Sequence, residues 1–294
     1  MSKANLFNIN SDEFIMSPKI DFVFKLIFGD EKNKEILIAF LSDVLRLPKE
    51  EFKNLELLKT ELLKEFKEDK KGILDVRVKT GNNEHIDIEI QILPTKFIAE
   101  RSLFYWSKMY NSQISSGDTY AKLKKCITIN IIDFETIPLD KIHTKFHVLE
   151  DETGYKLTDV LEIHFLELPK LENLDNLKDK DDPILEWLEF LDANSKEGME
   201  MLAKKNENIK EAYEILQKVS KSKEARMAYE ARQAEIMDQL TREETAKEEG
   251  REEEKLKSKK EKLEIAKGLI GILDENIIAE KFQLSIDEVD ELKK

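Results

Sequence analysis

The chain has 294 residues, of which 40% are hydrophobic and 37% charged, and its formal net charge at pH 7 is −14. This length and composition support a folded domain with an appendage, and the excess of acid argues against a protein that coats nucleic acid non-specifically. The single cysteine, Cys126, excludes an internal disulfide and a cysteine-rich zinc site. No signal peptide, membrane-spanning stretch or glycine-rich phosphate loop is recognisable, so we expect a cytoplasmic protein with no membrane partner.

The first predicted helix is an aromatic-rich segment that follows Pro18. Asp21 and Lys25 are four residues apart in it and therefore face the same side. On the residues alone, they make an ordinary surface ion pair of little energetic weight. A second helix, predicted over residues 31–45, is strongly amphipathic and is interpreted as structural.

A β-hairpin is predicted next, because apolar and polar residues alternate over 72–80 and again over 85–93. Gly81-Asn82-Asn83 supplies residues that tolerate positive φ in the turn between them. With the turn at this position, Asp75 lies opposite Glu89, whereas a shift of one position on each strand puts Arg77 there. In both registers the polar side chains share one face of the sheet.

Asp75, Glu89 and Gln91 are the strongest functional candidates on this face. Two carboxylates on one face repel each other unless a positive charge lies between them, and Mg²⁺ favours such oxygen ligands. A metal held there can activate water and stabilise charge on a phosphate, and Gln91 can orient a water or contact a phosphate. The alternative is an exposed, charged sheet face with ion pairs such as Arg77 to Asp87.

Further basic residues lie before and within the next predicted elements. Arg101 begins a predicted helix and either contacts phosphate or pairs with a core carboxylate. Lys122 and Lys124 precede a strand predicted over 126–132, where they meet nucleic-acid phosphates or belong to a solvated loop. Another strand is predicted over 162–168.

The four histidines, at positions 85, 143, 147 and 164, form no compact cluster in the sequence and are interpreted as ordinary surface or loop residues.

The C-terminal part has a different composition. An acidic connector over 173–183 leads into a region, 184–294, that is predicted to be helical throughout. Residues 223–262 have the composition of a long exposed helix, and 241–262 contain eight acidic and eight basic residues. Residues 263–294 resemble a small helix-turn-helix module, with Ala279 at the helix crossing and Ser285 as a cap. Because its second helix is acidic, we expect self-association, as a dimer, or contact with a partner in preference to DNA reading.

The order of motifs resembles a known family. SPKIDFVFKLIFGDEKN (17–33), LDVRVKT followed by IDIEIQ, the segment 100–134, and LTDVLEIHFLELPKL (157–171) are similar to recombination-promoting nucleases and transposases of the PD-(D/E)xK superfamily. The resemblance covers about residues 14–190. It implies an α/β fold, with a restriction-endonuclease-like mixed sheet flanked by helices over 1–172, and a magnesium-dependent DNA endonuclease activity in which Mn²⁺ is a possible substitute.

The resemblance also implies roles for single residues. Asp75 and Glu89 are expected to be the metal ligands, and Gln91 stands where the superfamily more often has lysine. Asp21 and Lys25 are expected near the metal, and Arg101 is expected to help place the substrate. The alternative is a catalytically inert binding or assembly protein on the same fold, which oligomerises through its helical C-terminal region.

Overall fold

The computed structural model describes residues 14–59, 75–179, 181–193 and 195–292. The chain divides into two compact units, one ending at Arg232 and one beginning at Gln233. The first unit thus extends past residue 172, where composition suggested that the nuclease-like domain ends. The apolar side chains of Trp187 and Phe190, which follow the acidic connector, are fully buried in this unit and therefore belong to its core.

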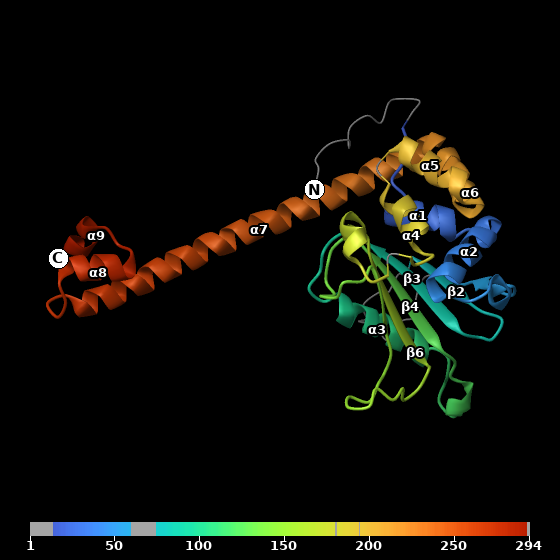
Figure 1. Cartoon of the computed structure of the whole chain (residues 1–294), viewed down its shortest axis with the longest axis horizontal. Coiled ribbons are helices and arrows are strands. Elements are labelled where there is room, and N and C mark those ends of the chain that lie inside the picture. Colours follow the sequence, from blue (N-terminus) through green and yellow to red (C-terminus); the bar gives the residue numbers. More distant parts are fainter. Residues whose placement is uncertain (1–13, 60–74, 180, 194, 293–294) are drawn as a thin grey trace. The chain divides into compact units, whose positions relative to one another are not determined.

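A six-stranded mixed sheet forms the centre of the first unit (Figure 1). The strand order is β1-β2-β3-β4-β6-β5, in which β3, β4 and β6 are parallel and the other neighbours are antiparallel. The strands are β1 (Glu56–Leu57), β2 (Val76–Lys79), β3 (His85–Gln91), β4 (Cys126–Ile132), β5 (His143–Phe146) and β6 (Leu161–Glu167). The expected α/β fold, a mixed sheet with flanking helices, is confirmed.

The β2–β3 hairpin has the first of the two registers considered. Val76 pairs with Ile88 and Arg77 pairs with Asp87, so the same register, continued by one residue, puts Asp75 opposite Glu89. Asn83 has a φ of 63° in the turn, the left-handed conformation that asparagine tolerates better than most residues. Among the described residues β2 begins at Val76 and ends at Lys79, and residues 72–74 of the strand expected over 72–80 lie outside the described residues.

A cluster of helices packs together in the same unit (Figure 1). They are α1 (Asp21–Phe28), α2 (Lys34–Leu45), α4 (Leu185–Asp192), α5 (Lys196–Lys205) and α6 (Glu207–Lys221). Rings from α1, α2 and α4 form its core, with Phe24, Phe28, Phe40 and Trp187 in edge-on or tilted contacts. Such contacts contribute beyond the burial of area alone. This core fixes the position of α1, which carries Asp21 and Lys25.

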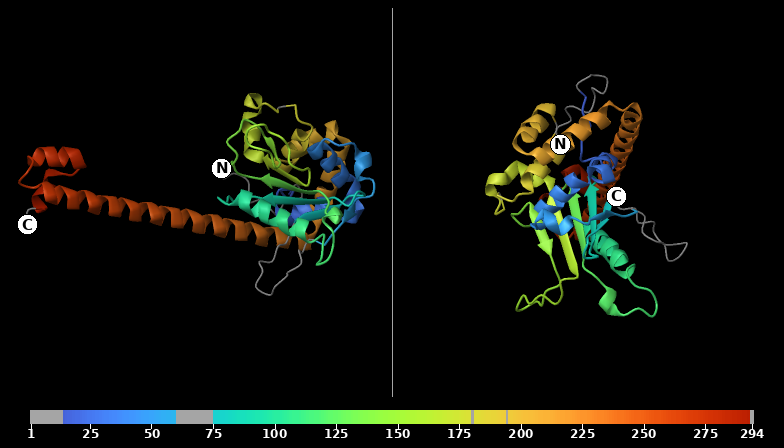
Figure 2. Two further views of the ribbon diagram at one scale, coloured as in Figure 1. Left: turned by 90° about the horizontal axis from the view of Figure 1, so that it is seen from below. Right: turned by 90° about the vertical axis from the view of Figure 1, so that its right-hand side faces the viewer.

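The helix α3 (Ile98–Asn111) runs alongside the sheet (Figure 2). It begins three residues before Arg101, where the sequence predicted its start. Ile98 packs with Ile132, Ile163 and Phe165 of the parallel strands. Ser102 bonds to Thr128 at 3.0 Å, which fixes the helix over β4. As a result, α3 covers the sheet face that contains the polar residues of β3.

The second unit contains most of α7 (Lys223–Leu269), with α8 (Glu275–Phe282) and α9 (Ile286–Glu291). Ala266, Ile278, Ala279 and Val289 form its small core. Ser285 caps α9 in a reciprocal capping box with Glu288, as the sequence predicted for the cap. A groove of about 770 Å³ beside Lys255, Lys259 and Phe282 is formed by this unit alone and contains none of the candidate site residues.

Among the described residues, no helix combines the length and the apolar character needed to span a bilayer.

Candidate active site

Asp75 and Glu89 are held together by backbone hydrogen bonds. The Asp75 amide donates to Glu89 Oε1 at 3.2 Å, and the Ile90 amide donates to Asp75 Oδ2 at 2.9 Å. Asp75 lies just before β2 and Glu89 lies near the end of β3, so these bonds extend the hairpin beyond its regular ladder. Each carboxylate therefore has one oxygen fixed by the chain and one oxygen directed at other groups.

The other oxygen of each carboxylate contacts a cationic side chain. Lys25 Nζ, from α1, is 3.1 Å from Asp75 Oδ1, and Arg101 Nη2, from α3, is 3.0 Å from Glu89 Oε2. Three elements that are distant in the sequence thus meet at the end of the hairpin. The structure brings together four of the predicted residues, Asp75, Glu89, Lys25 and Arg101.

Burial raises the pKa of both carboxyl groups. It is the largest influence on Glu89, whose pKa rises to about 7 with a further contribution from the charge of Asp75, against the opposing effect of Arg101. Burial also raises the pKa of Asp75, and the Ile90 amide and Lys25 oppose that rise. Two buried carboxyl groups with raised pKa values are typical of functional sites and attract a cation.

Asp87 is a third buried carboxyl group on this face, which sequence reasoning did not single out for function. Its side chain is 1% exposed, and neither carboxyl oxygen has a hydrogen-bond partner among the described residues. Burial, followed by the charges of Glu89 and Asp75, raises its pKa well above the usual value. The alternative of an exposed face with an Arg77–Asp87 ion pair is therefore wrong, because α3 covers these residues.

Gln91 does not direct its amide toward the carboxylates through any hydrogen bond in the described structure. Its Nε2 donates to the Leu93 carbonyl at 2.8 Å, just beyond the end of β3.

Beside the carboxylates, the Arg101 guanidinium lies over the Tyr105 ring, 5.3 Å from the centroid. Burial raises the pKa of Tyr105, and the nearby carboxylates raise it further. Tyr105 lies one helical turn after Arg101 and was not singled out from the sequence.

Three other candidate residues, Asp21, Lys122 and Lys124, contact groups outside the carboxylate pair. Asp21 pairs with Arg232 of α7 at 2.9 Å. The surface ion pair between Asp21 and Lys25 that their spacing suggested is therefore replaced by separate ion pairs, since Lys25 pairs with Asp75. Lys122 pairs with Asp118, and the backbone amide of Lys124 bonds to Gln113. Both lysines precede β4, whose first residue pairs with the first residue of β3, whereas Glu89 lies near the opposite end. The structure does not bring Lys122 and Lys124 to the carboxylates.

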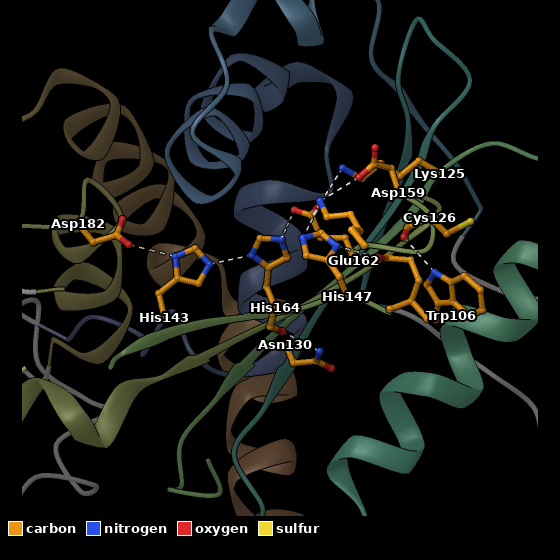
Figure 3. A network of polar contacts seen from close by, with 12 residues as sticks. Trp106, Lys125, Cys126, Asn130, His143, His147, Asp159, Glu162, His164 and Asp182 are labelled. Carbon is orange, nitrogen blue, oxygen red and sulfur yellow. Dashed lines mark hydrogen bonds and ion pairs between the residues drawn. The ribbon is translucent and has the colours of Figure 1, made fainter. Parts of the chain in front are cut away.

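Three of the four histidines lie in a second polar network, which the sequence did not predict (Figure 3). His143 Nε2 is 2.7 Å from His164 Nδ1, and the outer nitrogens contact Asp182 at 3.1 Å and Glu162 at 2.7 Å. His147 also approaches Glu162, at 3.9 Å. The interpretation of these histidines as ordinary surface or loop residues is wrong.

This network joins β5, β6 and the connector before α4. Burial lowers the pKa of His164 to about 4, although Glu162 opposes the shift. Despite burial, His143 and Arg46 hold the pKa of Asp182 at about 2. The network is therefore an anchor of the fold on the sheet face opposite Glu89, since His164 alternates with Phe165, which pairs with Asn130 beside Glu89.

The model of the PD-(D/E)XK nuclease family transposases matches residues 18–246, which is most of the chain. The chain belongs to this family. The match includes Asp75 and Glu89, the sheet, and helices α1 to α6 of the first unit. Comparison with curated proteins and with solved structures found no match in either set.

Members of the superfamily use divalent metal ions, and the carboxylates are compatible with one. Two carboxylates suffice for Mg²⁺, which keeps several waters and binds substrate phosphates as well. Asp75 Oδ1 and Glu89 Oε2 are the oxygens that face cationic groups, so they are the ones suited to a metal. The described part of the chain contains no group of three or more histidine, cysteine or acidic side chains arranged around one point for a metal.

Proposed function

We propose that this protein is a metal-dependent DNA endonuclease that hydrolyses phosphodiester bonds, with Asp75 and Glu89 as ligands of Mg²⁺ or Mn²⁺. The observation that carries the proposal is the pair of hydrogen bonds from the Asp75 and Ile90 amides to the two carboxylates. They fix one oxygen of each carboxylate and leave the other for a cation. A divalent ion bound there would supply an acidic water and positive charge for the phosphate. Family membership supports the nuclease chemistry.

The residues of the chain have distinct parts in this proposal. The backbone amides of Asp75 and Ile90 hold the two carboxylates in place before any ligand binds. Preorganised groups of this kind avoid the cost of reorganisation during the reaction. Arg101, whose side chain is 39% exposed, can contact both Glu89 and a phosphate that approaches from solvent. Substrate binding is expected to be local, because residues 1–170 contain 25 basic residues against 29 acidic ones.

A nicking assay on supercoiled plasmid with Mg²⁺ tests the proposal. Glu89→Gln keeps the shape and the hydrogen-bond acceptor of the side chain but removes its charge, and is expected to lower the rate by at least about 10²-fold. Glu100→Gln, an exposed glutamate in α3, is the matched control and should cleave normally. Equal cleavage by the wild-type protein and Glu89→Gln would contradict the proposed site.

A second candidate is an inert assembly protein on the nuclease fold, which associates as a dimer through its C-terminal helices. It is favoured by the long charged stretch of α7, in which residues 241–261 are all exposed. It predicts no cleavage with Mg²⁺ or Mn²⁺. It also predicts oligomers that dissociate when the chain is ended at residue 246, as measured by light scattering.

A further inference from the structure

Cationic side chains form the solvent side of the carboxylate pair. The side chains of Asp75 and Glu89 are 12% and 8% exposed, whereas those of Lys25 and Arg101 are 34% and 39% exposed. A phosphate that approaches the carboxylates from solvent therefore meets these cations at the same time. Without such cations, the acidic pair would repel a phosphodiester.

Within β3, the residue two positions after Glu89 carries no positive charge. Gln91 is neutral, and its amide nitrogen is bonded to the Leu93 carbonyl at 2.8 Å. It cannot neutralise the charge that builds up on a phosphate during hydrolysis. Any charge for that purpose beyond that of a bound metal ion must come from another element of the fold.

We infer that Lys25, supplied by α1, provides the positive charge that stabilises the phosphate during cleavage in place of the neutral Gln91. This role rests on the proposed nuclease function. Lys25 Nζ is 3.1 Å from Asp75 Oδ1, and its flexible stem lets the ammonium move between neighbouring oxygens. Asp21, one turn earlier on α1, is paired with Arg232 and does not hold Lys25 away from Asp75.

Arg101 is less suited to the same role. Its guanidinium is bonded to Glu89 at 3.0 Å and lies over the Tyr105 ring, so two contacts fix its position. Arg101 is thus fixed by two contacts and positions Glu89. Among the described residues, the Lys25 ammonium has one polar contact, to Asp75, so it is the group that can move to a substrate phosphate.

In the cleavage step, the oxygen of a water bonds to phosphorus and the bond from phosphorus to the leaving sugar oxygen breaks. The attacking water loses its proton to solvent, and the leaving oxygen takes up a proton from solvent. Negative charge increases on the non-bridging oxygens meanwhile, and Lys25 moves from Asp75 to one of them. A positive charge at this point lowers the barrier because it interacts more strongly with the transition state than with the ground state.

The test compares Lys25→Gln and Lys25→Arg with Lys32→Gln, which removes an equal charge from an exposed position between α1 and α2. Plasmid nicking is measured with Mg²⁺, and the affinity for Mn²⁺ alone is measured by calorimetry without DNA. Lys25→Gln should lower the cleavage rate about 10²–10³-fold. Lys25→Arg should restore part of the rate, and Lys32→Gln should match the wild-type protein.

The affinity measurement separates this role from a merely structural one. Lys25 competes with a bound cation for Asp75, so Lys25→Gln should bind Mn²⁺ as tightly as the wild-type protein or up to roughly fivefold more tightly. Unchanged cleavage by Lys25→Gln would overturn the inference while leaving the proposed function intact. Parallel losses of cleavage, Mn²⁺ affinity and melting temperature would overturn it as well. A wild-type protein that does not cleave refutes the proposed function, and this role of Lys25 with it.

Discussion

Glu89 is expected to destabilise the metal-free protein above neutral pH. Its pKa is raised from 4.5 to about 7, first by burial and then by the charge of Asp75. For an acid with a raised pKa in the folded state, the stability is fully present below the unfolded pKa and is lost as the pH rises through the folded pKa. A rise of this size corresponds to a loss of about 3 kcal/mol at pH 8.

Glu89→Gln removes this pH dependence, because the amide stays neutral. The free energy of unfolding of the variant, relative to that of the wild-type protein, should grow by about 2 kcal/mol between pH 5 and pH 8. For a unit of this size, that equals roughly 4–8 °C in melting temperature. The same substitution that abolishes cleavage is therefore expected to make the metal-free fold more stable.

The measurement is a melting curve at several pH values with EDTA present. Glu100→Gln, at an exposed position of α3, should follow the wild-type protein throughout. Addition of Mg²⁺ at pH 8 should raise the melting temperature of the wild-type protein and not that of Glu89→Gln. If Glu89→Gln differs from the wild-type protein by the same amount at pH 5 and pH 8, the reasoning about the buried carboxyl pair is wrong.

Two further substitutions and one truncation test other parts of the structure. His164→Phe leaves Glu162 without its ring partner and should cost about 3–5 kcal/mol in urea unfolding; a loss below about 1 kcal/mol would show that the network does not anchor the sheet. Lys170→Met removes the ammonium that bonds to three backbone carbonyls and to Glu167, and a similar loss is expected. Ending the chain at residue 246 should preserve the plasmid-nicking rate; a loss of cleavage would place part of the active protein in the second unit.

The alternation of residues was enough to predict the hairpin and the shared face of its polar side chains, but it left two registers open. Both registers place Ile86, Ile88 and Ile90 on the face away from the polar side chains, and the strand pairing of the structure selects the first of them. The strand predicted over 126–132 is also present as β4, and all seven of its residues are buried. Local rules thus placed Asp75 and Glu89 on one face of the hairpin, and the register of the structure puts them opposite each other.

The environment of the same residues was not predictable from the pattern. Alternation says that Asp87 and Glu89 share a face but not whether a helix covers it, and the α3 contact through Ser102 and Thr128 depends on tertiary packing. The histidine network was missed for a related reason. His143 and His164 meet because β5 lies antiparallel to β6, and the four residues of β5 show no alternation that predicts a strand.

The first turns of α7 help to place α1. The Tyr229 hydroxyl accepts a hydrogen bond from the Ser17 amide, and Arg232 is bonded to Asp21. Both contacts hold α1 at its beginning, and Lys25 lies one helical turn beyond Asp21 on that helix. The two contacts join segments that lie 212 and 211 residues apart in the sequence. The position of the helix that carries Lys25 therefore depends on side chains from the first turns of α7.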